Sequence, residues 1–315
     1  GVNDLLPQAV AVSSSTAAAS AADCKITVIS DAKIALPGMV EEYRSFVEAN
    51  FPPVNTNCSE IPTTCFRGAS LSGANFGACN LQQVVFEDAD LRGANFKRAN
   101  LTGASFFGAK LSYAKFAQAI LHHADLQDSA LDSANFEAAD LTDCVLKGAT
   151  LTKATFNQAT LRDAKLPADL SGVIFVAMQL QGFDLSLRTL VGAKFNRCDL
   201  TGAVLSGVEA SGCSFVDCKL LSCNLSASNL TNAKLDRSDA TAGNFGDAVL
   251  EGASLRNDTV LLGADFSGCD VSSLDLTSLD LSRIQVRGAQ LPQCLNEANL
   301  SGVDLSCTDL TGVDF

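Results

Sequence analysis

Residues 91–106 read LRGANFKRANLTGASF, and the same five-residue pattern recurs in LSGANF at 71–76 and in LTGVDF at 310–315. The unit is A-(D/N)-(L/F)-x-G or close to it. Leu or Phe stands at every fifth position from Phe66 to Leu166 without a miss, and the step of five then continues with small slips to the end of the chain. This repeat decides the fold.

A period of five fits neither the 3.6-residue period of an amphipathic helix nor the two-residue period of a half-buried strand. The backbone must therefore turn a corner every five residues. We expect the Leu or Phe, and the small residue two before it, to point inward. The Asp or Asn just before the Leu or Phe, and the two residues after it, then point outward. Gly is frequent two after the Leu or Phe, where a corner requires an unusual backbone conformation.

The spacing of phenylalanine predicts how many corners make one coil. One set of Phe residues recurs every twenty positions, with one step of nineteen: Phe76, Phe96, Phe116, Phe136, Phe156, Phe175, Phe195 and Phe215. Four five-residue sides per coil bring these rings into one column. The pattern thus predicts a four-sided solenoid in which each coil packs on its neighbours.

Three slips interrupt the step of five, at 167–169, 260–261 and 292–294. The step that starts at Leu170 runs to Val260, which is therefore expected to be an inward centre. The stretch Val173–Val191 also departs from the pattern, because larger side chains occupy its small inward positions. These are Met178, Phe183 and Arg188. We expect one face to bulge there as a loop, and loops on rigid scaffolds often carry function. Ser171–Leu190, with these three residues, is therefore a candidate interaction surface.

The motifs quoted above resemble those of the pentapeptide-repeat family, whose members fold as a right-handed quadrilateral β-helix. The resemblance covers about four-fifths of the 315 residues. It implies an all-β solenoid, a right-handed four-sided β-helix, over residues 66–315. The functions of the family are diverse, so the resemblance indicates the fold and leaves the function open.

Residues 1–65 lack the repeat and form an N-terminal extension. It contains an Ala/Ser-rich tract at 8–22, a segment at 24–30 that can form one short strand, and a segment at 37–51 with one apolar face that reads as a helix. We expect the extension to be a short helical and extended cap on the first coil, because solenoids need covered ends. Whether the tract binds its own solenoid or another chain stays open.

Seven of the twelve cysteines fall on the small inward position and are interpreted as buried thiols: Cys79, Cys144, Cys198, Cys213, Cys218, Cys223 and Cys269. The other five lie near the two ends and are disulfide candidates: Cys24, Cys58, Cys65, Cys294 and Cys307. We expect Cys294 to pair with Cys307, and two of the three N-terminal cysteines to pair. Such bonds indicate an oxidising compartment. A metal site is the rival interpretation, and the absence of any C-x-x-C spacing argues against it.

Nothing in the sequence indicates catalysis. His122 and His123 are the only histidines and fall on outward positions. The glycines belong to corners and form no phosphate loop. We expect no enzyme activity, no catalytic residue, no cofactor and no metal. No run of eighteen apolar residues occurs, so no membrane span is expected.

The net charge of −13 is unevenly distributed along the chain. Residues 66–121 hold 3 acids and 6 bases, whereas residues 236–315 hold 13 acids and 4 bases. An acidic surface on its own is often only a solubility feature. The acids of the last coils that precede an apolar centre are nevertheless candidate interaction residues: Asp265, Asp270, Asp275, Asp280, Asp304, Asp309 and Asp314.

Two functional hypotheses follow. The first is a non-enzymatic scaffold that binds a protein complex, such as a photosystem, on the lumenal side of a photosynthetic membrane, because the chain resembles family members of the chloroplast thylakoid lumen. The second is a DNA mimic, resembling family members that inhibit DNA gyrase, which would bind a DNA-binding enzyme through the acidic last coils and would be cytoplasmic. Neither implies direct binding to nucleic acid. A homodimer through the C-terminal coil is a further expectation, with a basic heterologous partner favoured by the charge of that coil.

Overall fold

The computed structural model describes residues 66–256 and 258–314. The extension over 1–65 lies outside them. The expected strand, the capping helix and the pairing among the three N-terminal cysteines therefore stay predictions.

Each five-residue unit forms one corner and one parallel β-bridge. The amide of Ala99 donates to the carbonyl of Phe96 at 3.0 Å, which closes the corner. The second residue of a corner has a left-handed backbone, with φ of +67° at Gly103 and +59° at Gln83. Glycine reaches this conformation at little cost, which explains its frequency two residues after the Leu or Phe. Within the described residues, no strand longer than a single bridge residue and no helix is formed.

A coil takes twenty residues and has four sides, as the phenylalanine spacing predicts. Asn95 pairs with Lys115, and Lys194 pairs with Ser214, each one coil further along the chain. The bridge residue donates back to the preceding coil, and the next amide donates forward. Asn95 N thus bonds to Ala74 O at 2.8 Å, while the neighbouring Phe96 N bonds to Lys115 O at 2.7 Å. Most sides of a coil are therefore tied to both neighbours.

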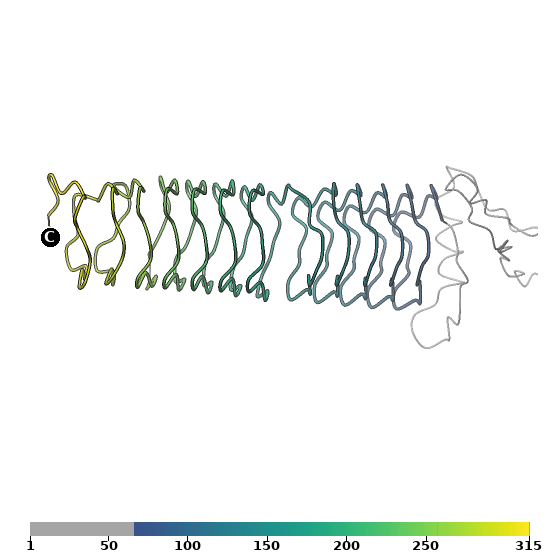
Figure 1. The fold of residues 1–315 in the computed structure, drawn as a ribbon. Coiled ribbons are helices and arrows are strands. Elements are labelled where there is room, and N and C mark those ends of the chain that lie inside the picture. The colour runs from purple at the N-terminus through teal and green to yellow at the C-terminus, as the bar shows by residue number, and fades with distance from the viewer. Residues whose placement is uncertain (1–65, 257, 315) are drawn as a thin grey trace, which may run out of the picture. The chain divides into compact units, whose positions relative to one another are not determined.

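The coils form two compact units. Unit 1 comprises Gly1–Thr150 and Ala159–Pro167, of which the described part begins at residue 66. Unit 2 comprises Leu151–Gln158 and Ala168–Phe315. Figure 1 shows the stacked coils of each unit, blue to teal in unit 1 and green to yellow in unit 2.

The slips change the number of residues in single coils and leave the side chains in register. The bridge from Thr155 to Ile174 spans nineteen residues, and the bridge from Asp239 to Val260 spans twenty-one. The prediction that Val260 is an inward centre is wrong, because Val260 occupies the outward bridge position and is 40% exposed. The extra residue of that coil lies between Leu255 and Leu261, both of which are buried.

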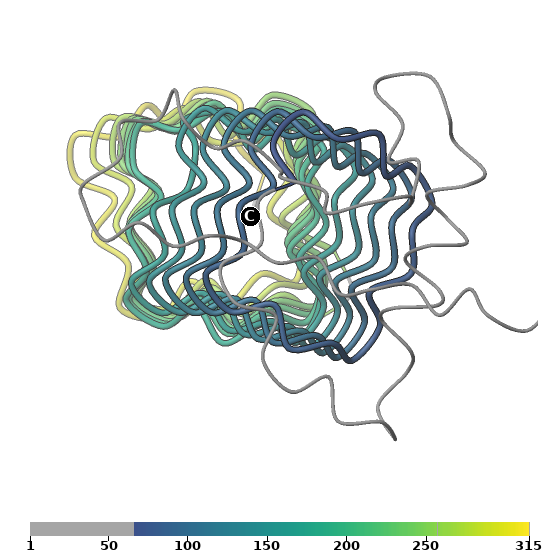
Figure 2. The same cartoon turned by 90° about the vertical axis from the view of Figure 1, so that its right-hand side faces the viewer.

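The core of each unit is a stack of apolar rows, and the expected Phe rows are present. In unit 1, Phe76, Phe96, Phe116 and Phe136 stack face to face at centroid separations of 4.9–5.1 Å. In unit 2, Phe156, Phe175, Phe195 and Phe215 stack at 4.9–5.4 Å. Figure 2 views the coils end-on, and successive coils of a unit follow nearly the same outline. All eight rings are buried.

Several buried polar side chains at the small inward position bond to the preceding coil. The thiol of Cys218 donates to the carbonyl of Phe195 at 2.6 Å, and the hydroxyl of Ser238 donates to the carbonyl of Phe215 at 2.5 Å. The thiol of Cys198 makes the same contact one coil earlier, at 3.5 Å. These three residues therefore keep a hydrogen bond in an apolar interior, where a lone polar group would be costly.

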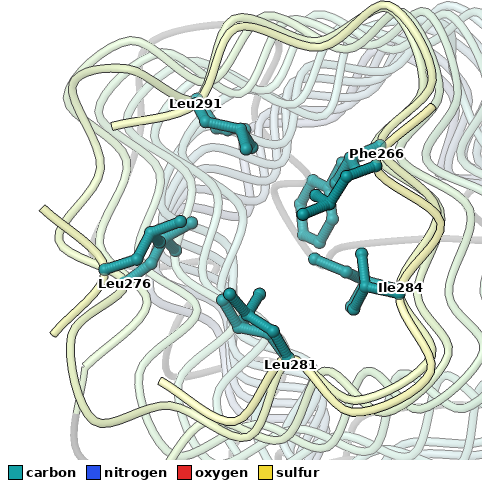
Figure 3. Close-up of a pocket in the computed structure, with 11 residues that line it drawn as sticks. Phe266, Leu276, Leu281, Ile284 and Leu291 are labelled. Atoms are coloured by element: carbon teal, nitrogen blue, oxygen red, sulfur yellow. The ribbon is translucent and has the colours of Figure 1, made fainter. Parts of the chain in front are cut away.

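The interior of the last coils contains a small cavity lined only by apolar side chains (Figure 3). Phe266, Leu276 and Leu281 are among them. With no polar group to orient a ligand, we interpret the cavity as imperfect core packing. In the last described coil, Leu305 is half-buried and Leu310 is 37% exposed.

Candidate interaction surfaces

The acidic candidates of the last coils occupy bridge positions, and their carboxylates also hold the corners. The Oδ1 atom of Asp270 accepts a bond from the amide of Ser272 at 3.0 Å and from its hydroxyl at 2.5 Å. These bonds, the hydroxyl bond first, lower the pKa of Asp270. Hydrogen bonds from Ser306 likewise lower the pKa of Asp304. The carboxylates of Asp270 and Asp304 are therefore held in place and ionised at neutral pH.

These carboxylates form two acidic rings. The first ring puts one carboxylate on each side of a coil: Asp265, Asp270, Asp275 and Asp280. The second ring holds Asp304, Asp309 and Asp314. The coil between them carries Arg283, Arg287 and Glu297 at its corners but has uncharged bridge residues. These pair with every aspartate of the two rings except Asp275: Gln285, Gln290, Cys294 and Asn299. The structure thus distributes the predicted acidic residues over all four sides and gathers them on no single face.

Positive charge gathers on one side of unit 2, a feature that the linear sequence does not reveal. We call this side the Phe face, because its inward residues are Phe175, Phe195 and Phe215. Between residues 174 and 256 its outward positions carry five exposed cations: Lys194, Arg197, Lys234, Arg237 and Arg256. Two acids lie among them, Asp217 and Asp236. The Phe face is net positive here, although residues 168–256 as a whole hold 9 acids and 7 bases.

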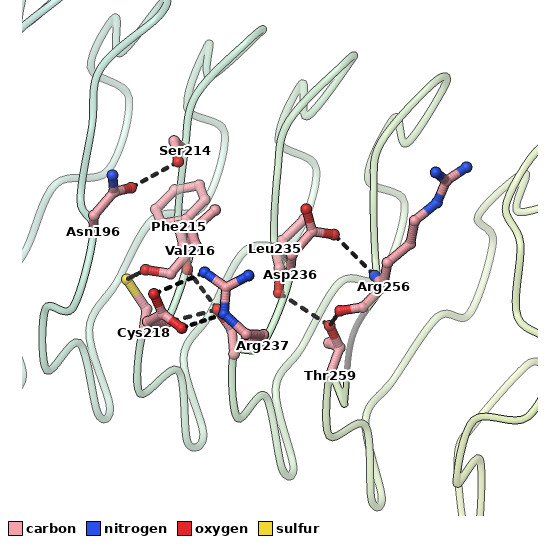
Figure 4. A network of polar contacts seen from close by, with 12 residues as sticks. Asn196, Ser214, Phe215, Val216, Cys218, Leu235, Asp236, Arg237, Arg256 and Thr259 are labelled. Atoms are coloured by element: carbon pink, nitrogen blue, oxygen red, sulfur yellow. Dashed lines mark hydrogen bonds and ion pairs between the residues drawn. The ribbon is translucent and has the colours of Figure 1, made fainter.

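Ion pairs and hydrogen bonds connect the coils across the Phe face (Figure 4). Arg237 binds Asp217 of the preceding coil through Nε–Oδ1 at 2.6 Å and Nη2–Oδ2 at 2.9 Å. This contact lowers the pKa of Asp217. The carboxylate of Asp236 accepts bonds from the hydroxyl of Ser254 and from the amide of Arg256. The two acids are thus engaged, and three cations remain in excess.

The stretch from Val173 to Val191 does not form the expected loop. Its bridges continue to the next coil, as between Ile174 and Lys194, so the wall is regular. Met178 is also a correction, because it is only 1% exposed and so cannot form a surface contact. Its flexible thioether fills the interior in place of a small residue.

Phe183 and Arg188 are half-buried at their inward positions. The Nη1 atom of Arg188 donates to the exposed carbonyl of Asp184 at 3.1 Å, while its Nε atom stays buried without a hydrogen-bond partner. The most exposed apolar residue of this stretch is Leu187, at 83%, which the sequence interpretation missed. Its φ of +56° places it at the second corner position. This position, two residues after Leu185, was the signal in the sequence that Leu187 points outward.

The cysteines divide as expected between interior and surface, but the predicted Cys294–Cys307 bond is absent. All seven inward cysteines are buried. Cys294 and Cys307 are exposed, free thiols. Cys294 is the bridge partner of Asp314. Cys307 lies at the corner before Asp309, on the preceding side of the coil, so the two thiols lie on different sides. The other three disulfide candidates lie outside the described residues.

The histidine pair lies on the surface of unit 1. The Nε2 atom of His122 lies 2.7 Å from Oδ2 of Asp140, and the Nδ1 atom of His123 lies 3.8 Å from Oδ2 of Asp143. No group of three or more His, Cys, Asp or Glu side chains suited to a metal ion occurs in the described part of the chain. Within that same part, no helix is long and apolar enough to cross a membrane.

Comparison with known families agrees with the coil geometry. The profile for a pentapeptide repeat region matches residues 59–136. The profile for pentapeptide repeats in eight copies matches residues 131–166, 189–220, 218–257 and 280–315. The chain belongs to the pentapeptide-repeat family. Its fold is therefore the right-handed four-sided β-helix of these proteins.

Solved pentapeptide-repeat structures resemble the chain. HetL from Nostoc sp. strain PCC 7120 is 23% identical over 74% of this chain and 91% of its own, with a TM-score of 0.33. A protein from the Arabidopsis thaliana thylakoid lumen is 32% identical over 36% and 78%, with a TM-score of 0.19. The fluoroquinolone resistance protein QnrB1 is 21% identical over 62% and 87%, with a TM-score of 0.25. A search of curated proteins finds no match. At these TM-scores the likeness carries no argument about function.

Proposed function

We propose that this pentapeptide-repeat protein is a non-enzymatic scaffold that docks onto a basic surface of a protein complex through the acidic rings of its last coils. The observation that carries the proposal is the fixed position of the carboxylates. Asp280, Asp304 and Asp309 each accept a bond from the backbone amide two residues on, at 2.9–3.0 Å. A charge already held in place loses little conformational freedom when a partner binds.

The proposal also specifies the chemistry of the partner. Complementary charge directs encounter and orientation, so rings of carboxylate favour a basic protein surface. The chloroplast thylakoid lumen is the compartment that the sequence resemblance implies, and a photosynthetic membrane complex exposed to the lumen is the partner we propose there. The free thiols of Cys294 and Cys307 remove one of the arguments for an oxidising compartment, so the compartment needs its own test.

Co-sedimentation with inside-out thylakoid vesicles, which expose the lumenal side, tests this function. A triple variant, Asp280→Asn, Asp304→Asn and Asp309→Asn, removes three charges and keeps the Oδ1 acceptor of each corner. We expect it to bind roughly tenfold more weakly, given about 0.2–1 kcal/mol for each exposed ion pair. The matched control makes the same change at Asp169, Asp184 and Asp239 and should bind as the wild type does. Equal binding by both triple variants, or no binding by the wild type, would reject the proposal.

A DNA mimic is the second candidate, because the acidic rings place carboxylates on all four sides of the coil, as phosphates surround a duplex. The cations of the Phe face argue against it. The test is supercoiling by purified DNA gyrase with the protein added. Inhibition that the Asp→Asn triple variant loses would favour the mimic and a cytoplasmic location, and uninhibited supercoiling would exclude it.

A further inference from the structure

The bridge positions of the Phe face form a single column that runs from the cationic coils into the acidic rings. From coil to coil the column reads Lys194, Ser214, Lys234, Ser254, Asp275, Cys294 and Asp314. The β-bridges join the first four residues in order and also join the last two. Asp275 adjoins Ser254, because each lies five residues after a member of the Val249–Asp270 bridge. Cys294 adjoins Asp275 in the same way, because each lies five residues before a member of the Asp280–Asn299 bridge.

This column has a palindromic charge pattern centred on Ser254. One coil away lie Lys234 on one side and Asp275 on the other. Two coils away lie the uncharged Ser214 and Cys294. Three coils away lie Lys194 and Asp314. Each cation therefore has an anion at the same distance on the opposite side of Ser254, with a coil spacing of about 4.8 Å.

We propose that two copies of this chain pair antiparallel through their Phe faces, about a two-fold axis that passes at Ser254. Reversal of one copy brings Lys234 opposite Asp275 of the other, and Lys194 opposite Asp314. The two-fold axis repeats each contact, so four Lys–Asp pairs form at once. A surface that is complementary to itself in this way is the requirement for a symmetric dimer.

Other registers of the column are worse. With the axis moved one coil toward the N-terminus, Lys234 of one copy faces Lys234 of the other. With the axis moved one coil toward the C-terminus, Asp275 of one copy faces Asp275 of the other. A parallel arrangement in register places lysine against lysine and aspartate against aspartate. Only the axis at Ser254 matches every charge of the column with its opposite, and like charges penalise the alternatives.

The corner residues of the Phe face permit the same register. Glu297 approaches Asp217, but Arg237 already binds Asp217, and Arg197 lies one coil before it. Two copies of Arg256 meet near the axis, and so do two copies of Asp258 from the same corner. Asp236 lies in the preceding coil and Asp275 in the next. Arg197 of one copy lies in the coil that faces Asp314 of the other.

A second copy fits this surface better than a partner of one sign. A basic partner would be repelled by the coils around Lys194 and Lys234, and an acidic one by Asp275 and Asp314. The carboxylates proposed for docking, Asp280, Asp304 and Asp309, lie on the other three sides. This inference goes beyond the docking function and can fail independently of it.

Sedimentation velocity of the full chain at low and high salt tests the pairing. We expect the wild type to approach twice the monomer mass at low ionic strength and to dissociate at roughly 0.5 M salt, because exposed ion pairs are screened. The double variant Lys194→Asp/Lys234→Asp and the double variant Asp275→Lys/Asp314→Lys should each be monomeric. An equimolar mixture of the two should dimerise, as should the chain that carries all four changes. Lysine and aspartate both occur naturally at bridge positions, so these changes suit the coil.

The matched control is Lys165→Asp/Lys219→Asp, which makes the same charge change at bridge positions on other sides and should leave the dimer intact. Equal loss of dimer in this control would overturn the proposal. So would a wild type that is monomeric at every salt concentration, or a dimer that the Phe-face variants do not affect.

Cross-linking locates the axis. Under mild oxidation by copper–phenanthroline, Ser254→Cys should form a disulfide with its own position in the second copy. Ser214→Cys should form one with the native Cys294, and peptide mapping would identify both bonds. Ser226→Cys, on another side of the coil, should form neither. Cross-linked dimer at Ser226→Cys with none at Ser254→Cys would contradict the proposed register.

Discussion

Phe116 and Phe136 stack one coil apart, with their ring centroids 4.9 Å apart and their planes inclined by only 3°. Both rings are fully buried, so neither can be shortened without leaving a cavity. We expect Phe136→Ala to lower the free energy of unfolding by about 3–5 kcal/mol, measured by urea denaturation. The matched control is Phe107→Ala, because Phe107 lies at a corner and is 43% exposed. A loss at Phe107 as large as that at Phe136 would contradict the account of the core.

The bridge-position aspartates should show their role in the corner by mutation. Asp270→Ala removes the acceptor for the amide and the hydroxyl of Ser272 and should cost about 1 kcal/mol of stability. Asp270→Asn keeps an oxygen at Oδ1 and should be nearly neutral. Denaturation curves of the two variants measure the difference. Equal stability of both variants would show that the carboxylate does not hold the corner.

Alkaline pH should destabilise the protein through its buried thiols. Burial raises the pKa of Cys144 and Cys223 to about 12, whereas an unfolded thiol ionises near pH 8.5. The unfolded state therefore loses its thiol protons first, and the free energy of unfolding should fall as pH rises above about 8.5. Thermal denaturation at pH 7 to 10 measures this. Cys144→Ala/Cys223→Ala should reduce the slope, because Ala occupies the same inward position elsewhere and does not ionise.

Low pH should also destabilise the protein, through carboxylates whose pKa is lowered in the folded state. Hydrogen bonds from Ser272 and Thr277 hold the pKa of Asp270 and Asp275 below its ordinary value. The folded state therefore binds fewer protons than the unfolded state, so this contribution is present above about pH 4 and is lost as pH falls below it. Denaturation midpoints from pH 6 to 2 should show the decline, and Asp270→Asn/Asp275→Asn should weaken it. An acid limb unchanged in that variant would contradict the assignment.

The thiols should differ in reactivity. Cys294 and Cys307 are exposed, whereas Cys198 and Cys218 are buried and have a raised pKa, chiefly through desolvation. Because the thiolate is the reactive form, a brief treatment with iodoacetamide should modify the first pair and spare the second. Peptide mapping by mass spectrometry reads each site. Rapid modification of Cys198 in the native protein would contradict the inward position.

The sequence predicted the features that depend on local periodicity. The Phe rows, the four sides, the glycine corners and the buried cysteines all follow from a side chain's place within five residues. The failures have physical causes. Val260 is apolar but lies at an outward position, because the extra residue of its coil comes earlier. Met178 is large but flexible enough to fit the interior, so no loop forms.

The charge pattern shows the limit of the linear sequence. Lys194 and Lys234 lie forty residues apart in the chain but on one side of the coil, two coils apart. Counting charges by segment averages over all four sides and therefore hides the Phe face. The cations and anions separate only when the chain is arranged in coils of nineteen, twenty or twenty-one residues. The positions of the slips set these coil lengths, and the repeat pattern alone does not fix them.

Carboxylate footprinting tests the central claim most directly, which is that the acidic rings are the docking surface. Carbodiimide labelling with an amine, read residue by residue by mass spectrometry, would compare the free protein with the protein bound to inside-out thylakoid vesicles. The account predicts that Asp280, Asp304 and Asp309 lose reactivity on binding, while Asp169 and Asp184 keep theirs. Unchanged labelling of the acidic rings in vesicle-bound protein, or protection of Asp169 and Asp184 in their place, would contradict it.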